Sequence, residues 1–190
     1  MQRPFICDET YKGNDYTQNP LPKAEYENCV FQNCRFSEGY LDNQNFMDCE
    51  FIECDLTNAN IKHAVFKDCF FKDSKLIGLH FEDCDKMLFS VNFDTCNLSF
   101  ASFFELSLSE TKLVDCILKE TDFTDCYLTS AVFRNCDLEK AIFSNTNLEK
   151  VNFSSSFNFD INPEENRMKG AKFSKDNLIG LLKKYDIVVT

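Results

Sequence analysis

Residues 27–36 read ENCVFQNCRF, which is one five-residue phrase, x-Asn-Cys-x-Phe, written twice in succession. Steps of five from Phe31 in both directions meet only Phe, Leu, Tyr or Ile between positions 26 and 81. Lys86 breaks the series, and a shift of two residues restores it from Leu88 to Phe153. The 190-residue chain therefore contains 26 apolar anchors in register, interrupted by one two-residue insertion.

A second position of the repeat, two residues before each anchor, accounts for the cysteines. Ten of the eleven cysteines fit this position, where they alternate with Ala, Ser, Thr and Val, which neither bind zinc nor form disulfides. A free Cys behaves as a small buried apolar residue, so we predict that these thiols pack in the core. Disulfides or a metal site are the alternative, although the chain has no C-x2-C pair. The ten are Cys29, Cys34, Cys49, Cys54, Cys69, Cys84, Cys96, Cys116, Cys126 and Cys136, and only Cys7 lies elsewhere.

A period of five fits neither a helix, which repeats every 3.6 residues, nor a strand, which repeats every 2. It fits a coil with flat sides, in which the anchor and the small residue point inward and the other three residues point outward. Those three are mostly Asn, Asp, Glu, Ser, Thr and Lys. One unit cannot bury its apolar residue alone, whereas stacked turns can, so the pattern predicts an all-β solenoid.

The units resemble the pentapeptide-repeat family, whose consensus is roughly A(D/N)Lxx. The resemblance covers about residues 24–156 and implies a right-handed quadrilateral β-helix of twenty residues per coil. Cys29, Cys49 and Cys69 then form one inner column. The clearest units are CDL at residues 54–56, ANI at 59–61, CNL at 96–98, TDF at 121–123 and CDL at 136–138.

Three regions are expected along the chain. Residues 1–23 are an irregular first coil or N-terminal cap, residues 24–173 the β-helix, and residues 174–190 a short α-helix and strand. Ser174 is the expected N-cap, and residues 187–189 are the expected strand. The C-terminal segment is predicted to cover the last coil and to form a dimer interface. The interface residues are Leu178, Leu181, Leu182, Tyr185, Ile187 and Val188.

The run DINPEENR at residues 160–167, followed by this helix and IVV, looks like the end of the microcin B17 immunity protein. It also resembles, more loosely, the tail of the Qnr-type quinolone-resistance proteins. This resemblance implies an end-to-end homodimer that imitates duplex DNA and binds DNA gyrase or topoisomerase IV, protecting it from a peptide toxin or a quinolone. Qnr-type relatives carry longer projecting loops, where this chain has two extra residues.

The charge agrees with a basic partner. The net charge is −11, which disfavours direct binding to nucleic acid. The acid is biased towards two adjoining faces, although a chance distribution is the alternative. One face, with the anchors Leu41, Ile61 and Phe81, carries Asp42, Glu82, Asp83, Glu105, Asp122 and Asp125. The next face carries Glu25, Glu27, Asp48, Asp68, Glu110 and Glu149.

The insertion is predicted to form a small bulge that carries Asp85 and Met87 at the boundary of these two faces. Three phenylalanines fall at nominally outward positions nearby, namely Phe89, Phe100 and Phe104. Exposed aromatic side chains on a polar rod indicate a contact site. The alternative is that they shield neighbouring coils.

The sequence predicts no enzyme. It lacks a Gly-rich phosphate loop, an HExxH motif and a nucleophile elbow, and both histidines fall at outward positions. The N-terminus has no secretory pattern and no apolar stretch approaches 18 residues, so a cytoplasmic protein is expected. The expected function is a non-enzymatic DNA mimic, without a cofactor or metal, that binds gyrase. The alternative is an acidic scaffold for another protein.

Overall fold

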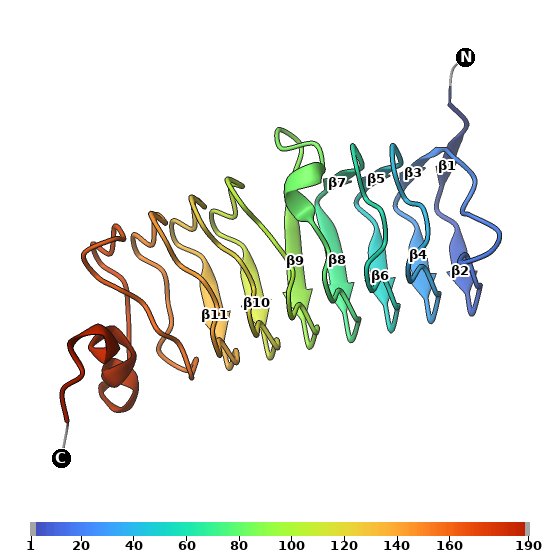
Figure 1. The fold of residues 1–190 in the computed structure, drawn as a ribbon. Helices are drawn as coiled ribbons and strands as arrows, with labels where there is room; N and C mark the ends of the chain where they lie inside the picture. Colours follow the sequence, from blue (N-terminus) through green and yellow to red (C-terminus); the bar gives the residue numbers. More distant parts are fainter. Residues whose placement is uncertain (1–2, 189–190) are drawn as a thin grey trace.

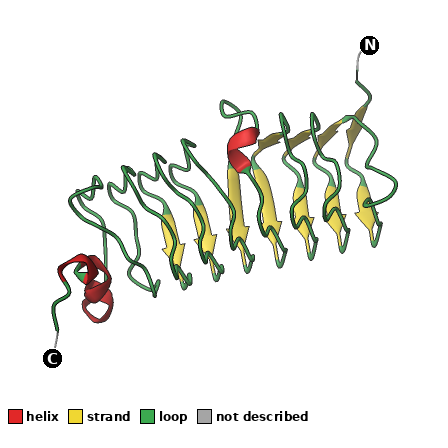
Figure 2. Cartoon of the chain, viewed as in Figure 1, coloured by secondary structure: helices red, strands yellow, loops and turns green. Residues whose placement is uncertain are grey.

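The structure, a computed structural model, describes residues 3–188, which form one parallel β-solenoid (Figure 1). Its strands are short because each fills only one side of a coil. They are β1 (Phe5–Cys7), β2 (Thr10–Lys12), β3 (Glu25–Glu27), β4 (Val30–Gln32), β5 (Asn45–Met47), β6 (Glu50–Ile52), β7 (Val65–Lys67), β8 (Cys69–Lys72), β9 (Val91–Asp94), β10 (Lys112–Val114) and β11 (Val132–Arg134). Three short 3-10 helices complete the elements: η1 (Phe81–Asp83), η2 (Lys175–Leu181) and η3 (Lys183–Tyr185) (Figure 2).

The strands pair with a shift of twenty residues, as the repeat predicts. One sheet has the order β1-β3-β5-β7, and Phe46 pairs with Phe66 in it. The other has the order β11-β10-β9-β8-β6-β4-β2. Between β8 and β9 the shift is 22 residues, because Phe71 pairs with Phe93 across the insertion.

Two further columns of isolated parallel bridges run along the rod. One passes through Asp15, Arg35 and Asp55, and the other through Tyr40, Asn60 and, further on, Asp122. Four columns of parallel pairing therefore share each twenty-residue coil. We name the sides by their columns: side A holds β1-β3-β5-β7, side B the longer sheet, side C the column of Asp15, and side D the column of Tyr40.

The chain turns a corner after every unit, at the second residue past the anchor. These corner residues have positive φ, such as 52° at Asp48 and 57° at Asp125. Asn and Asp tolerate this left-handed conformation better than most residues, because their short side chains bond locally. The polar residues of the repeat thus serve the turn as well as the surface.

The anchors form continuous stacks inside the coil, and 13 of the 21 phenylalanines are anchors. Ring centroids of Phe31 and Phe51 lie 4.9 Å apart, as do those of Phe51 and Phe71, in nearly parallel planes. Phe81 and Phe103 stack at 4.7 Å across the insertion. Offset stacks of this kind stabilise aromatic pairs beyond their area of burial.

The small position is also explained. All ten cysteines of this position are buried and free, as predicted. Many of its side chains donate a hydrogen bond to the carbonyl oxygen of the residue 23 positions earlier. The Cys54 thiol bonds to Phe31 O at 3.1 Å, the Ser74 hydroxyl to Phe51 O at 3.1 Å, and the Thr121 hydroxyl to Leu98 O at 2.9 Å.

The ends differ in part from the expectation. Residues 5–12 already pair in register with the next coil, since Tyr11 lies opposite Phe31. The C-terminal helix is 3-10 rather than α, since its turns close between residues three apart, as in the bond from Leu182 N to Ile179 O. The predicted strand is wrong at residues 187–188, which have no regular structure, and residue 189 lies outside the described part. Within residues 3–188, no helix is long and apolar enough to cross a membrane.

Candidate partner-binding surface

The insertion forms a projecting loop beside η1, about midway along the rod (Figure 1). The Asp85 carboxylate accepts hydrogen bonds from Met87 N at 2.9 Å and Leu88 N at 3.1 Å, which fixes the backbone of the loop. Lys86 Nζ reaches Glu105 Oε2 on the next coil at 3.1 Å. The loop is therefore held on both sides while the Met87 side chain is 95% exposed.

Two predicted positions are exchanged at this loop. Leu88 was expected in the core but is 46% exposed, whereas Phe89 was expected outside but is 9% exposed. The ring of Phe89 packs against Phe81 with centroids 5.6 Å apart, because the larger aromatic side chain fills the space above the Phe81 ring. The prediction that Phe89 points outward is therefore wrong. Phe104 is partly exposed and Phe100 is 57% exposed.

Two carboxylates of side D, those of Asp42 and Glu105, are paired with lysines within the chain. Asp42 pairs with Lys23 at 2.9 Å, and this ammonium lowers the pKa of the Asp42 carboxyl. Glu105 pairs with Lys86. Glu82 lies 3.0 Å from the His80 ring, and its second oxygen is buried with no hydrogen-bond partner among the described residues.

Asp83, Asp122 and Asp125 behave differently, since none has a Lys or Arg within ion-pair distance in residues 3–188. Asp83 is exposed at the end of η1. Asp122 accepts the Thr124 N–H at 2.8 Å, and Asp125 accepts from the Asn145 amide. Neither bond cancels the negative charge, so side D presents these three charges to a partner.

Side C shows the contrast. Four of its acids pair with basic residues: Asp15 with Arg35 at 3.1 Å, Asp137 and Glu139 with Lys119 at 3.2 and 2.8 Å, and Glu120 with Lys140 at 3.8 Å. The predicted acids of side A form no ion pair among the described residues; they are Glu25, Glu27, Asp48, Asp68, Glu110 and Glu149. Counting residues in the sequence found the excess of acidic residues on sides D and A. It missed that ion pairs along side C make the contrast in unpaired charge between the sides larger. A count of Lys and Arg one coil away from each carboxylate contains that signal.

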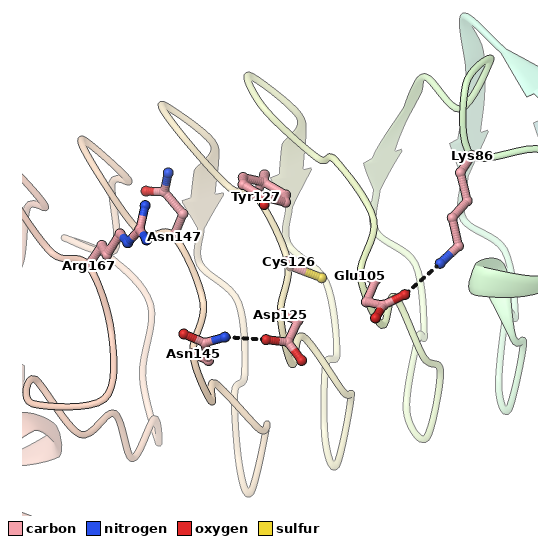
Figure 3. A pocket seen from close by; sticks show the side chains of 8 residues that line it. All are labelled: Lys86, Glu105, Asp125, Cys126, Tyr127, Asn145, Asn147 and Arg167. Atoms are coloured by element: carbon pink, nitrogen blue, oxygen red, sulfur yellow. Dashed lines mark hydrogen bonds and ion pairs between the residues drawn. The ribbon is translucent and has the colours of Figure 1, made fainter.

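A shallow groove of about 510 Å³ follows the corner between sides D and A (Figure 3). Lys86 and Glu105 lie at one end and Arg167 at the other, with Tyr127 between them (Figure 3). The sulfur in its wall belongs to Cys126, whose pKa burial raises to about 12. This thiol stays protonated at neutral pH and is a poor nucleophile. The side chains of the groove can therefore contact a partner, but the groove has no activated thiol.

The predicted dimer residues divide into two sets. Leu181 packs against the core cluster and belongs to the cap, and Leu182 is half-buried. Leu178, Tyr185, Ile187 and Val188 are exposed, with Val188 at 88%. Ile179 is also exposed, although the sequence did not single it out.

Two family models match the chain on either side of the loop. "Pentapeptide repeats (8 copies)" matches residues 27–62 and 54–85, and "Pentapeptide repeat region" matches residues 86–157. Together they span more than half of the chain. No curated protein matches the sequence.

Several solved structures align over most of the chain. Full-length QnrB1, a plasmid-mediated fluoroquinolone resistance protein, is 19% identical and covers 96% of this chain and 100% of its own, with a TM-score of 0.45. HetL from the cyanobacterium Nostoc sp., a pentapeptide repeat protein involved in heterocyst differentiation regulation, is 14% identical. It covers 92% of this chain and 86% of its own, with a TM-score of 0.36.

Proposed function

The chain belongs to the pentapeptide-repeat family, and from this premise we propose that it is a non-enzymatic protein that binds DNA gyrase or topoisomerase IV in place of DNA. Binding would protect the enzyme from a peptide toxin or a quinolone-type poison. We take the rod to be a right-handed quadrilateral β-helix that works in the cytoplasm. The observation that carries the proposal is the set of unpaired carboxylates on side D, Asp83, Asp122 and Asp125.

The spacing of these charges supports imitation of a phosphate backbone. Consecutive coils lie about 4.8 Å apart, the distance between paired strands. Each strand of duplex DNA carries one phosphate per about 3.4 Å of axis. Sides D and A together carry the twelve predicted carboxylates over about six and a half coils, which gives a linear charge density of the same order. A basic DNA channel would attract such a surface.

Membership of the family does not by itself identify the partner. QnrB1 is described as a resistance protein and HetL as a protein of differentiation regulation, so one repeat carries different roles. The second candidate function is accordingly a scaffold that binds another protein through the same surface. The exposed apolar side chains of the loop, Met87 and Leu88, favour a protein surface in either case.

We also propose a homodimer formed through the C-terminal end. Residues 160–190 contain six Lys or Arg and five Asp or Glu, whereas residues 1–159 contain 14 against 26. The C-terminal ends of two copies can therefore meet without strong charge repulsion. The contacting side chains would be Leu178, Ile179, Tyr185, Ile187 and Val188.

The test is gyrase supercoiling with purified protein, with and without a quinolone or microcin B17, and with a relaxation control. The variant Asp83→Asn/Asp122→Asn/Asp125→Asn removes three charges, and Asn retains the left-handed corner at position 125. The matched control is Glu50→Gln/Glu53→Gln/Asp73→Asn, which removes three exposed carboxylates from side B.

The native protein should rescue supercoiling, or inhibit it in a way that added DNA competes away. The side D variant should lose this effect and the control should keep it. An absence of any effect of the native protein over a wide concentration range would reject the gyrase proposal and favour the scaffold. Equal losses in both triple variants would show that side D is not the contact surface.

A further inference from the structure

Phe100 does not fit the rule of its position. It occupies a corner with a φ of 60°, and every other described residue of positive φ is polar or glycine. A bulky side chain in the left-handed region carries a backbone cost. Burial does not offset that cost, because the side chain is 57% exposed and forms no ring pair with another aromatic residue of the described chain. Strained residues without a structural reason occur at functional sites.

Phe100 lies at the corner where side D begins, and side D runs from this corner to the loop. Phe104 follows on the same side and is partly exposed, and Glu105 beside it holds Lys86 of the loop at 3.1 Å. Residues 100–105 span at most about 18 Å. Phe100, Phe104, Met87 and Leu88 therefore form an apolar belt across side D at the middle of the rod. The corner of the preceding coil is Gly78, which has no side chain to cover Phe100.

The belt lies between negative charges. Asp83 lies on the coil before it, and Asp122 and Asp125 lie on the coil after it. This composition selects against two classes of occupant, since an anionic lipid surface and nucleic acid would both meet repelling carboxylates. A second copy would bring the same acids. The complementary surface is that of a protein with basic side chains around an apolar recess.

We infer that the apolar belt is the central contact for a protein partner whose basic surface contains an apolar recess. That the partner is gyrase rests on the proposed function. That the partner surface is basic with an apolar recess rests on the belt alone. The rigid loop supports this role, because the two bonds to Asp85 fix the backbone from which Met87 and Leu88 project. Such preorganised apolar side chains lose little entropy on binding.

The key variant is Phe100→Asn. Asn is favoured in the left-handed region, so the variant should unfold at a temperature about 1–3 °C higher while binding more weakly. Met87→Ser/Leu88→Ser is the second variant. Ser130→Asn is the matched control, because Ser130 has a φ of 63° at a corner away from the belt. It should gain stability without losing binding.

The probes are two peptides of equal charge, six lysines with either two leucines or two serines at the centre. The native protein should bind the leucine peptide at least about threefold more tightly, as burial of leucine predicts. This ratio should fall to about one in Phe100→Asn and in Met87→Ser/Leu88→Ser, and stay in Ser130→Asn. A ratio of one in the native protein, or a ratio that Phe100→Asn leaves unchanged, would overturn the inference.

Two further readouts separate this inference from the proposed function. If the peptides discriminate but gyrase shows no response to the native protein, the gyrase proposal fails and the belt stands. If gyrase responds to the side D charges but not to Phe100→Asn, the belt is wrong and the gyrase proposal stands. A change in the sedimentation of the protein alone on Phe100→Asn would identify a second copy as the occupant and contradict the inference.

Discussion

At the scale of single residues, the residue type two positions before each anchor is decided by size and by one hydrogen bond. Cys, Ser and Thr all fit, because each is small and each can donate to the carbonyl 23 residues earlier, as Cys126 does to Phe103 O at 2.7 Å. Ala fits by size alone. The eleven cysteines, which suggest redox or metal chemistry when counted, thus include ten that serve as packing residues with a weak donor.

This bond can be measured at Thr121. Its hydroxyl donates to Leu98 O at 2.9 Å and is fully buried. Thr121→Val keeps the shape but removes the donor, so the free energy of unfolding should fall by about 1–2 kcal/mol. Thr111→Val is the control, because the Thr111 hydroxyl donates no hydrogen bond within the described residues. Urea denaturation measures both, and equal losses would contradict the role of the bond.

The buried thiols predict a loss of stability in alkali. Burial raises the pKa of Cys96 and of Cys126 from 9.0 to about 12. The folded state therefore holds these protons more tightly, so their contribution is complete below pH 9 and is lost between pH 9 and 12. The urea midpoint should fall over that range. The fall should be shallower in Cys96→Ala/Cys126→Ala, and an unchanged slope would show that these thiols do not drive it.

At the scale of elements, η2 closes the C-terminal end of the core. Ile161 N donates to Gly180 O at 3.0 Å, and the Asn177 amide donates to Ser156 O at 2.8 Å. Leu181 packs on the core cluster below. This contact requires glycine, since a Cβ at position 180 would overlap the Phe159 ring and lie 2.6 Å from the Phe159 carbonyl oxygen.

Gly180→Ala should therefore lift the cap. We expect a loss of about 1–3 kcal/mol, typical of an overpacked contact, and faster hydrogen exchange in residues 157–173 than in the central coils. Lys175→Ala, an exposed position of the same helix, should change little. If Gly180→Ala unfolds like the native protein, with unchanged exchange near Phe159, then η2 is not the cap.

At the scale of the whole molecule, the rod should be a dimer. Sedimentation should give twice the chain mass of 22.1 kDa. Ile179→Asp/Val188→Asp places charge among the exposed apolar side chains of the C-terminal end, so it should give a single-chain mass with an unchanged circular dichroism spectrum. Tyr40→Asp, an exposed position near the other end, is the control. A native protein of 22.1 kDa would contradict the dimer.

The solenoid could be predicted because its signal repeats. A single CDL unit means little, but 26 anchors in register leave one architecture, and the anchors that the structure describes are buried with few exceptions. The prediction that Leu88 is buried was wrong because the five-residue phase is undefined inside an insertion. Either Leu88 or Phe89 could fill the one core position there, and Phe89 does. The C-terminal helix was predicted to be α but is 3-10, because apolar residues three and four positions apart do not by themselves distinguish the two helix types. The pairing of acids was hidden because it joins residues twenty positions apart.

The loop at residues 84–88 has a mechanical consequence. On side A the parallel pairing stops at Lys67 and resumes only where Ser107 faces Tyr127, while the other three sides continue through β8–β9, Lys75–Asn97 and His80–Ser102. Backbone bonds still join the first step of this gap, from Asp85 N to Ala64 O and from Ser90 N to Phe66 O, both at 2.9 Å. Across the second step, in the described chain, the Lys86–Glu105 ion pair takes the place of backbone bonds. A rod whose coils are paired without interruption on three sides, but not on the fourth, bends most easily at the interrupted side. The rod should therefore flex there and adjust its curvature to the surface that it meets.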